Sequence, residues 1–430
     1  MNKNKRAILI ISQWETPWGV KKGVGVPERH RLIKKWASKG YDVYVVSGTS
    51  KKGMSDREED CYTQFYFKLP LFQWDLKNLP VKPKSTINFI IRKMFSIWDI
   101  TVFTIFATIK TFKVTKSRDV ALIYSFGEFG VLVSKLIARL RGVPFVVRLY
   151  GTILYSSFKA VGSLSWKRFL YVPLINYLAF RINAEQIIVT DDDCKADLLP
   201  QFMKIRAPMA LIRIGVDKLP FLNVKVNNID LIKKQYGLDK YHVVVGNIGR
   251  FAERKRNHLL LKALPKVISA IKDVKIGVAL IGGGESLKKY QNIIQQHGLQ
   301  PYVKICGPVP REEIPTFFYC IDIYYSVLSQ MNLCTAFVEA MVTGRCVLTT
   351  DELRENEFVI NNKTVVMVQE ADNEEEMVNS IAEKIIFLVR NKNFRNLIAR
   401  NAKLYAERFV PTVDEAVEKE FEIAKNLIKN

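Results

Sequence analysis

The sequence has 430 residues, of which 48% are hydrophobic and 25% are charged. This composition is typical of a globular protein of about two domains. Uncharged runs such as residues 100–109 and 169–180 are shorter than the ~20 residues that cross a bilayer, so no spanning helix is expected. The six cysteines form no C-x-x-C pair and the histidines do not cluster, which indicates neither a zinc site nor a disulfide framework and favours a reducing cytoplasm.

The net charge of +23 is unevenly distributed along the chain. Residues 1–218 hold 36 basic and 17 acidic side chains, and the remainder holds 29 and 25. Such a field favours an anionic partner, for example a membrane surface, a phosphorylated carrier or polymer, or nucleic acid. A generally basic proteome would explain the charge equally simply. Because no nucleic-acid motif accompanies the charge, we expect no nucleic-acid partner.

Short runs rich in Val and Ile, separated by segments of helical period, predict parallel sheets covered by helices. In the first half, Pro27 is expected to open a helix that Gly40 ends, giving one β-α-β unit. The run 7–11 is too short for a secretory leader and is interpreted as the first strand. The predicted strands are 7–11, 42–46, 120–124, 145–149 and 186–189, followed in the second half by 243–247, 275–281, 303–306, 321–325 and 346–349.

This pattern places the chain in the α/β class, with two Rossmann-like domains facing across a cleft that lies beyond the carboxyl ends of their strands. The first domain is predicted to span 1–217. A polar, helix-poor stretch at 218–237 is interpreted as the linker, and the second domain spans 238–410. A final amphipathic helix at 411–430 is long enough to cross back to the first domain.

Residues that suit phosphate binding follow the strands of the second half. Arg250 and Lys255 lie after a glycine turn and before a helix, an arrangement suited to a diphosphate. A solvated basic loop is the alternative explanation. Further glycine turns occur at 282–285 and 306–310, although such turns are weak evidence alone. A helix at 335–341, ended by Gly344, presents N-terminal amides that would stabilise a departing phosphate.

With these motifs, the sequence resembles glycosyltransferase family 4 (glycosyl transferases group 1), retaining enzymes of the GT-B fold, over nearly its whole length. The match is most specific over 243–350. The resemblance implies an N-terminal acceptor-binding domain and a C-terminal nucleotide-sugar-binding domain. It implies that Gly249, Arg250 and Lys255 grip the donor diphosphate, with Arg256 as the other register for the lysine, and that Glu339 holds the ribose hydroxyls. The remaining residues implied at the donor site are Val309, Asn332, Leu333 and Thr335.

The chain departs from the family pattern at three places. Met331 replaces the first Glu of the paired-Glu motif, although Asn-Leu in the next positions also occurs in relatives. Tyr150 replaces the His of the usual His-Gly, and it could donate a hydrogen bond to sugar or acceptor but is a poor proton acceptor at neutral pH. The interdomain Pro-Asn-Gly-Val-Asp reads Arg-Ile-Gly-Val-Asp at 213–217, which is expected to affect the hinge.

Two further motifs are interpreted by position. Gly23 and Gly25 stand where the family has a glycine-rich loop after the first strand, and would let backbone approach the acceptor or donor closely, unless they form a plain turn. The Asp run 191–193 follows a strand, so at least one Asp is expected to cap a helix rather than to bind metal. No metal or other cofactor is expected, because Arg250, Lys255 and a helix dipole would neutralise the leaving diphosphate.

The resemblance implies a hexosyltransferase that moves sugar from a UDP- or GDP-linked donor with retention of configuration. The departing phosphate would help to deprotonate a glycan or lipid-linked acceptor in polysaccharide or glycoconjugate synthesis. A non-catalytic GT-B subunit is the main alternative. Residues 68–118 contain ten basic and two acidic side chains among aromatic and aliphatic ones. This segment would lie on an anionic membrane as a peripheral cytoplasmic protein, or form a core helix whose lysines reach solvent.

Overall fold

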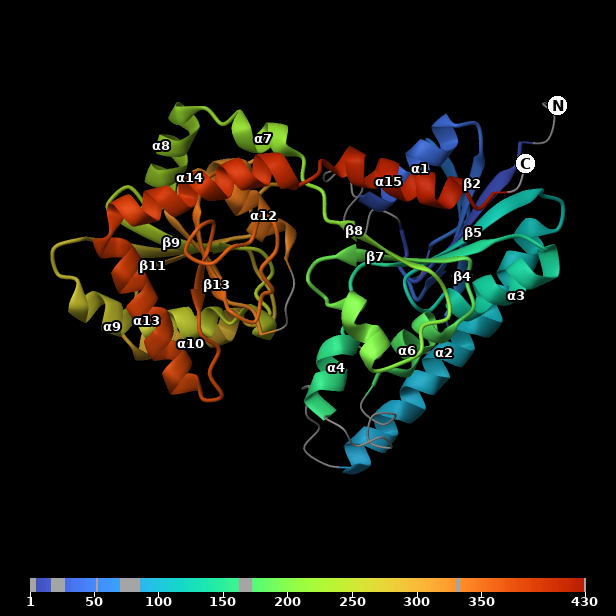
Figure 1. The fold of residues 1–430 in the computed structure, drawn as a ribbon, viewed down its shortest axis with the longest axis horizontal. Helices are drawn as coiled ribbons and strands as arrows, with labels where there is room; N and C mark the ends of the chain where they lie inside the picture. Colours follow the sequence, from blue (N-terminus) through green and yellow to red (C-terminus); the bar gives the residue numbers. More distant parts are fainter. Residues whose placement is uncertain are drawn as a thin grey trace. The chain divides into compact units, whose positions relative to one another are not determined.

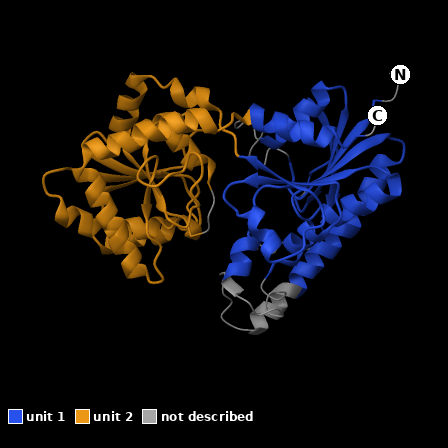
Figure 2. Ribbon diagram, viewed as in Figure 1, with its two compact units in different colours: residues 1–213, 414–430 blue, residues 214–413 orange. Residues whose placement is uncertain are grey.

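The computed structural model describes residues 5–16, 28–51, 53–69, 86–161, 172–329 and 333–428. The chain divides into two compact units (Figure 2). Unit 1 contains Met1–Arg213 together with Asp414–Asn430, and unit 2 contains Ile214–Val413. Each unit encloses its own hydrophobic core.

Unit 1 is built on an eight-stranded sheet of order β3-β4-β2-β1-β5-β6-β7-β8. All of its strands pair in parallel except β3, which is antiparallel to β4. The side chains of β1 and β5 are buried along their whole length, as expected where helices cover both faces of a parallel sheet. The strands are β1 Ala7–Ser12, β2 Asp42–Thr49, β3 Arg57–Glu59, β4 Tyr62–Lys68, β5 Val120–Phe126, β6 Phe145–Leu149, β7 Gln186–Asp191 and β8 Met209–Arg213.

Helices cover the two faces of this sheet, and α2 runs beside α3 along one of them (Figure 1). Helix α1 buries Leu32, Ile33 and Trp36 and is followed by Gly40 at φ +88°, so its predicted end is confirmed. Pro27, which was expected to open the helix, lies outside the described residues. The helices of unit 1 are α1 Glu28–Ser38, α2 Thr86–Thr115, α3 Val131–Arg141, α4 Leu154–Val161, α6 Leu174–Arg181, the 3-10 helix η2 Ala196–Gln201 and α15 Val413–Lys425.

Unit 2 has a six-stranded, wholly parallel sheet of order β11-β10-β9-β12-β13-β14. Its strands are β9 Val243–Ile248, β10 Ile276–Ile281, β11 Val303–Gly307, β12 Ile323–Ser326, β13 Cys346–Thr350 and β14 Val366–Val368. Its helices are α7 Lys218–Leu222, α8 Val226–Gln235, the 3-10 helix η3 Glu253–Lys255, α9 Asn257–Ala270, α10 Leu287–Gln296, α11 Ile314–Tyr319, α12 Thr335–Val342, α13 Glu374–Arg390 and α14 Lys392–Phe409.

All ten strands expected from the sequence are present, and two Rossmann-like units are confirmed. Strands β3, β4, β8 and β14 were not expected. Strand β4 alternates buried and partly buried residues instead of forming a run of Val and Ile, and β14 has only three residues. Runs of Val and Ile, which predicted the central strands, are therefore a weaker signal for strands toward the sheet edges.

The stretch 218–237 is not helix-poor, because it contains α7 and α8. Phe221 and Ile232 of these helices are buried in a core of unit 2. Unit 2 begins at Ile214 and includes the whole interval that was interpreted as a linker. The polar residues of α8 that suggested a loop lie on its exposed face.

Helix α15 packs on unit 1, which confirms that the end of the chain returns to the first domain. Its Phe421 ring lies 4.6 Å from the Trp36 ring of α1, centroid to centroid. The buried Glu420 carboxylate accepts a 2.7 Å hydrogen bond from Nε of Arg148, the fourth residue of β6. Nη2 of Arg148 also donates to Glu28 at 2.5 Å. Apolar packing and a buried ion-pair network therefore hold the C-terminal helix on the first sheet.

Helix α2 is longer than the sequence analysis allowed. Among the described residues, Met94–Thr115 is long and apolar enough, by length and composition, to cross a membrane, and 33% of the tested window is buried. The uncharged runs in the sequence underestimated the length of this apolar stretch because charged residues such as Asp99 and Lys110 interrupt it. Its buried residues, including Phe103 and Ala107, belong to the core of unit 1.

Candidate functional site

Three loops at the carboxyl ends of β9, β10 and β11 are joined by backbone hydrogen bonds. The amide of Gly249 donates to Ile281 O at 2.9 Å, and the amide of Gly282 donates to Gly307 O at 2.8 Å. Phe251 N donates to the Gly283 carbonyl at 2.8 Å. The glycine turns seen as weak separate signals in the sequence thus form one continuous backbone surface in unit 2.

Two of these glycines are required by close backbone approach. A Cβ on Gly282, at φ +133°, would lie 2.0 Å from the carbonyl oxygen of Gly249. A Cβ on Gly284, at φ +154°, would lie 2.5 Å from the carbonyl oxygen of Phe251. Residues with side chains rarely adopt these φ values and would separate the loops. The glycines therefore fix the loop that carries Arg250.

Lys255 ends the 3-10 helix η3 and is buried, with 6% of its surface exposed. Its ammonium group donates to Cys334 Sγ at 3.4 Å, and within the described part of the chain it forms no ion pair. Cys334 is the N-cap of α12, whose first amides carry partial positive charge. A buried cation beside a helix N-terminus, with only a thiol as partner, provides a site for an anion.

Arg250 and Arg256 occupy different environments on the same loop. Arg250 is exposed, and its Nε lies 3.2 Å from Glu285 Oε2. Such a surface pair is weak, so the guanidinium can exchange Glu285 for a ligand phosphate. Arg256 adopts a left-handed backbone at φ +49° before α9, and its Nη1 pairs with Glu370 at 2.6 Å. Of the two neighbouring cations Lys255 and Arg256, Lys255 therefore has no carboxylate partner among the described residues, whereas Arg256 has one.

Glu339 lies on α12 with 7% of its surface exposed. Burial raises the pKa of its carboxyl to about 7, while Arg311 opposes this rise and Asp217 adds to it. No hydrogen bond to the carboxylate occurs among the described residues. A buried carboxylate of this kind is suited to accept hydrogen bonds from ligand hydroxyls.

The remaining donor-site candidates of unit 2 differ in exposure. Leu333 is buried in the core under α12, whereas Thr335 is the exposed first residue of that helix. Val309 packs against the same core and is partly buried. Asn332, together with Met331 beside it, lies outside the described residues. Gly344 follows α12 at φ +66°, which confirms the predicted end of the helix.

Tyr150 lies in unit 1 between two guanidinium groups. The Cζ atoms of Arg148 and Arg29 lie 4.1 and 5.3 Å from its ring centroid. Trp14 packs edge-on at 5.4 Å. The buried hydroxyl of Tyr150 has no hydrogen-bond partner among the described residues. Burial raises the pKa of Tyr150 well above its ordinary value, so the phenol stays neutral at neutral pH and can donate a hydrogen bond but neither releases nor takes up a proton.

The sequence did not indicate that Arg29 and Trp14 would contact Tyr150. Trp14 follows β1 by two residues and Arg29 is the second residue of α1, so the shared feature is their position beyond the carboxyl edge of the sheet. Gly151, at φ +91°, is held close to Asp192, because a Cβ there would lie 2.8 Å from Asp192 Oδ2. The candidates Gly23 and Gly25 lie outside the described residues.

The Asp run after β7 does not form the expected helix cap. The 3-10 helix η2 that follows has Lys195 as its N-cap, without a side-chain hydrogen bond. Asp192 is buried, and burial raises its pKa to about 6. No group of three or more His, Cys, Asp or Glu side chains in the described ranges is placed to hold a metal ion. All six cysteines are free thiols.

Most of unit 2 matches a known protein family. Residues 228–405 match the family model of glycosyl transferases group 1. The phosphatidylinositol N-acetylglucosaminyltransferase GPI3 subunit of Saccharomyces cerevisiae is 27% identical over 211 residues, covering 49% of this chain and 44% of the yeast protein. D-inositol 3-phosphate glycosyltransferase of Corynebacterium urealyticum is 25% identical over 39% of this chain and 41% of its own. The chain thus matches less than half the length of these curated relatives.

Solved structures match over nearly the whole chain. Sucrose-phosphate synthase from Thermosynechococcus elongatus has a TM-score of 0.72 at 14% identity, covering 98% of this chain and 99% of that one. Anabaena HepE, solved with UDP-glucose, has a TM-score of 0.65 at 18% identity and the same coverage. At these identities the likeness establishes the fold, which is of the GT-B type.

Proposed function

We propose that this chain, whose residues 228–405 belong to the glycosyl transferases group 1 family, is a retaining glycosyltransferase of the family 4 type. It moves a sugar from a nucleoside-diphosphate donor to a glycan or lipid-linked glycan acceptor. The observation that carries this proposal is the buried ammonium of Lys255, whose partner among the described residues is a thiol at the N-terminus of α12. A donor diphosphate supplies the negative charge that this position lacks.

The other donor-site residues support the same ligand. Arg250 lies on the glycine-fixed loop and can reach a phosphate by releasing its exposed partner Glu285. The ribose hydroxyls of the donor donate hydrogen bonds to Glu339. Because the buried carboxylate of Glu339 accepts no hydrogen bond from the described residues, these new bonds increase the affinity for the donor. HepE, a structural neighbour, was solved with UDP-glucose, which supports a nucleotide-sugar donor.

In this proposal, catalysis consists of orientation and neutralisation of charge. The bond between the sugar and the diphosphate breaks, and its electron pair leaves with the diphosphate. Lys255, Arg250 and the α12 amides stabilise that charge, so no metal ion is required. The acceptor hydroxyl attacks from the same face and passes its proton to the departing phosphate. Tyr150 orients sugar or acceptor through its hydroxyl and takes no proton.

The acceptor and the location of the protein are proposals of the same kind. Similar proteins include enzymes whose names specify phosphatidylinositol or inositol phosphate. The excess of positive charge in residues 1–218 suits an acidic or lipid-linked acceptor at the inner face of a membrane, with the protein in the cytoplasm. Synthesis of a surface polysaccharide or glycoconjugate is the corresponding role.

One alternative is a non-catalytic GT-B subunit that binds glycan or stabilises a transferase partner. Met331 in place of a Glu, and the neutral Tyr150 in place of a His, favour it. A subunit that never binds donor has no use for a buried unpaired lysine, so this alternative predicts that no nucleotide sugar binds.

Calorimetric titration with UDP- and GDP-linked sugars tests the proposal. The wild-type protein is expected to bind one donor saturably, and Arg250→Ala is expected to weaken that binding by about tenfold or more. Lys272→Ala, which removes an exposed lysine elsewhere in unit 2, serves as the matched control and should bind like wild type. Absence of binding by any donor would favour the non-catalytic subunit.

A further inference from the structure

Helix α2 carries an unusual share of the exposed apolar surface of the chain. Of 17 exposed large hydrophobic side chains among the described residues, eight lie on this one helix. They are Met94, Phe95, Ile97, Trp98, Ile105, Phe106, Ile109 and Phe112. A soluble surface helix usually presents charged and polar side chains on the face that points away from the core.

The outer face of α2 forms a continuous stripe. Its exposed positions recur at intervals of three or four residues, which keeps them on one side of the helix. Thr101 is the only polar residue of the stripe before its end, and its hydroxyl donates to Ile97 O at 2.8 Å, so no polar group is left to solvate. The stripe consists of Met94, Trp98, Thr101, Ile105, Ile109, Phe112 and finally Lys116.

The opposite face of α2 fixes the helix to the sheet. Phe103 packs edge-on against Phe67 of β4 at 5.3 Å and lies 5.7 Å from Phe129. Val102, Ala107 and Val114 are buried in the same core. The helix cannot leave the sheet to span a bilayer without exposing that core. It can therefore only lie along a membrane surface.

Basic side chains accompany the stripe. Lys113 and Lys116 are exposed near its end, and Lys135 and Arg139 are exposed on the neighbouring α3 beside Leu136 and Leu140. The only acidic residue of α2 is Asp99, which is buried, and α3 has none. On α2 and α3 themselves, apolar and cationic groups occur without exposed acidic ones, and the nearby Asp56 is paired with Lys110 of α2. This composition matches an anionic lipid surface better than it matches another protein of mixed charge.

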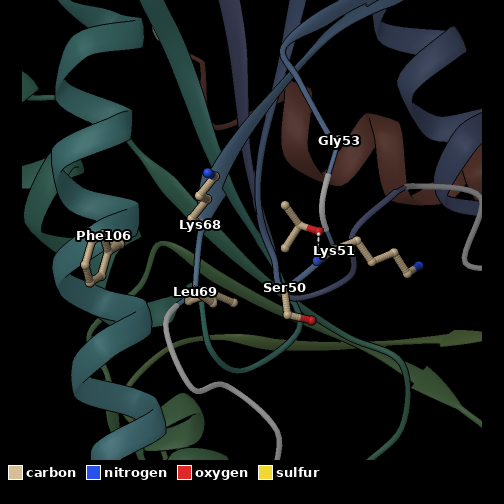
Figure 3. Close-up of a pocket in the computed structure, with 7 residues that line it drawn as sticks. Ser50, Lys51, Gly53, Lys68, Leu69 and Phe106 are labelled. Carbon is tan, nitrogen blue, oxygen red and sulfur yellow. Dashed lines mark hydrogen bonds between the residues drawn. The ribbon is translucent and has the colours of Figure 1, made fainter.

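A hollow of about 440 Å³ adjoins the stripe at the carboxyl ends of β2 and β4. Figure 3 shows Phe106 of α2, Lys68 and Leu69 at the end of β4, and Ser50 and Lys51 after β2 around it. Lys68 and the Ser50 hydroxyl at the rim suit a phosphate-bearing headgroup, whereas Lys51 is paired with Glu15. Leu69 and Phe106 suit the carbon chain next to the headgroup.

We propose that the outer face of α2 and the adjoining hollow form a docking surface for an anionic phospholipid bilayer, with the apolar stripe inserted among the lipid chains and a lipid headgroup in the hollow. This proposal does not depend on transferase activity, because it concerns unit 1 and needs no donor.

Flotation of the full chain with lipid vesicles tests it. The protein is expected to bind vesicles of equimolar phosphatidylglycerol and phosphatidylcholine, and to bind pure phosphatidylcholine vesicles much less. Ile105→Ser with Ile109→Ser removes two stripe residues that are 51% and 50% exposed. This pair of changes should lower the apparent affinity about tenfold. Leu397→Ser with Leu404→Ser on α14, at residues 51% and 55% exposed, is the matched control and should bind like wild type.

The hollow has its own test. Lys68→Ala should weaken binding to the anionic vesicles about fivefold and leave binding to neutral vesicles unchanged. The exposed Lys272→Ala of unit 2 should change neither. Arg250→Ala should bind vesicles like wild type even though it binds the donor more weakly, which separates failure of this proposal from failure of the proposed activity.

Three results would overturn the proposal. The first is a wild-type protein that binds neither kind of vesicle. The second is an equal loss for the α14 control, which would indicate general adhesion of apolar side chains. The third is concentration-dependent self-association in sedimentation velocity that the α2 variant abolishes, without vesicle binding, which would assign the stripe to a second copy of this chain.

Discussion

Glu339 and Lys255 are buried ionisable side chains, and neither forms an ion pair with the residues that the structure describes. Burial of such groups costs stability unless a ligand completes them. For Glu339 the cost is expressed as a pKa raised to about 7. An ordinary core would place an apolar residue there, so both side chains are better explained by a ligand than by folding.

Replacing Glu339 by Gln is expected to stabilise the free protein in a pH-dependent way. Because the folded-state pKa is raised, the carboxyl favours folding below its ordinary pKa, and this contribution is lost as pH rises through about 7. At about pH 8 the variant should therefore gain up to about 3 kcal/mol in free energy of unfolding, and at about pH 4 nearly nothing. Urea unfolding followed by tryptophan fluorescence measures both values.

The exposed Glu383→Gln on α13 is the control for that experiment, and it should change little at either pH. An equal effect of Glu339→Gln at both pH values would contradict the assignment of a raised pKa to Glu339.

Donor binding is expected to show the reverse pH dependence. Ribose hydroxyls donate to the charged carboxylate, so affinity for a nucleotide sugar should increase about tenfold as pH rises through about 7. Nucleotide sugars are suitable ligands because their diphosphate, a diester, does not titrate in this range. Glu339→Gln should bind more weakly and without this pH dependence. Calorimetry at several pH values distinguishes the two proteins, and an unchanged slope in the variant would exclude Glu339 as the titrating group.

At the scale of elements, α15 depends on one buried ion-pair network. Arg148 is completely buried between Glu420 and Glu28. Burial alone would lower the pKa of Arg148, and the two carboxylates outweigh it and raise that pKa. Glu420→Ala removes one of the two carboxylates that pair with Arg148, and it is expected to lower the free energy of unfolding by about 3–5 kcal/mol. Thermal unfolding measures it.

Glu418→Ala on the same helix provides the comparison, because Glu418 pairs with Lys35 on the surface. Loss of that exposed pair should cost at most about 1 kcal/mol. Similar losses for the two variants would mean that α15 is held by its apolar contacts, such as Phe421 with Trp36, and not by the network.

Most central elements could be predicted from the sequence, and the reasons for the failures are local. Strands of Val and Ile buried on both faces have a distinct composition, so the central strands of both sheets were found. Helix α8 was missed because its polar, Asn-containing sequence also suits a loop, and α7 was missed because it has only five residues, one of them a proline. The apolar stretch of α2 was underestimated because charged residues such as Asp99 and Lys110 divide it in the sequence.

The candidate site could be predicted in part. Loop glycines and the basic residues after β9 were visible in the sequence. Burial of Lys255, its contact with Cys334 and the pairing of Arg256 with Glu370 depend on strands brought together by the fold. The surroundings of Tyr150 could not be read from spacing, because Trp14, Arg29 and Arg148 come from three separate segments.

At the scale of the whole molecule, the two units have separate cores, and the end of the chain belongs to the first. Truncation after Val413 removes Phe421 and Glu420 from unit 1 and removes nothing from the cores of unit 2. Thermal unfolding of the truncated chain should therefore show a lowered transition for unit 1 and an unchanged transition for unit 2. A uniform shift of a single transition would contradict this division.

The central claim is that Lys255 and the N-terminus of α12 hold a donor diphosphate. The most direct measurement compares the affinities of uridine, UMP and UDP, or the guanosine series if that donor binds, for wild type and Lys255→Met. Methionine fills the buried volume without the charge. The account predicts that UDP binds wild type far more tightly than uridine does, and that the variant loses most of this difference while still binding the nucleoside. A variant that binds UDP like wild type, or that loses uridine equally, would contradict it.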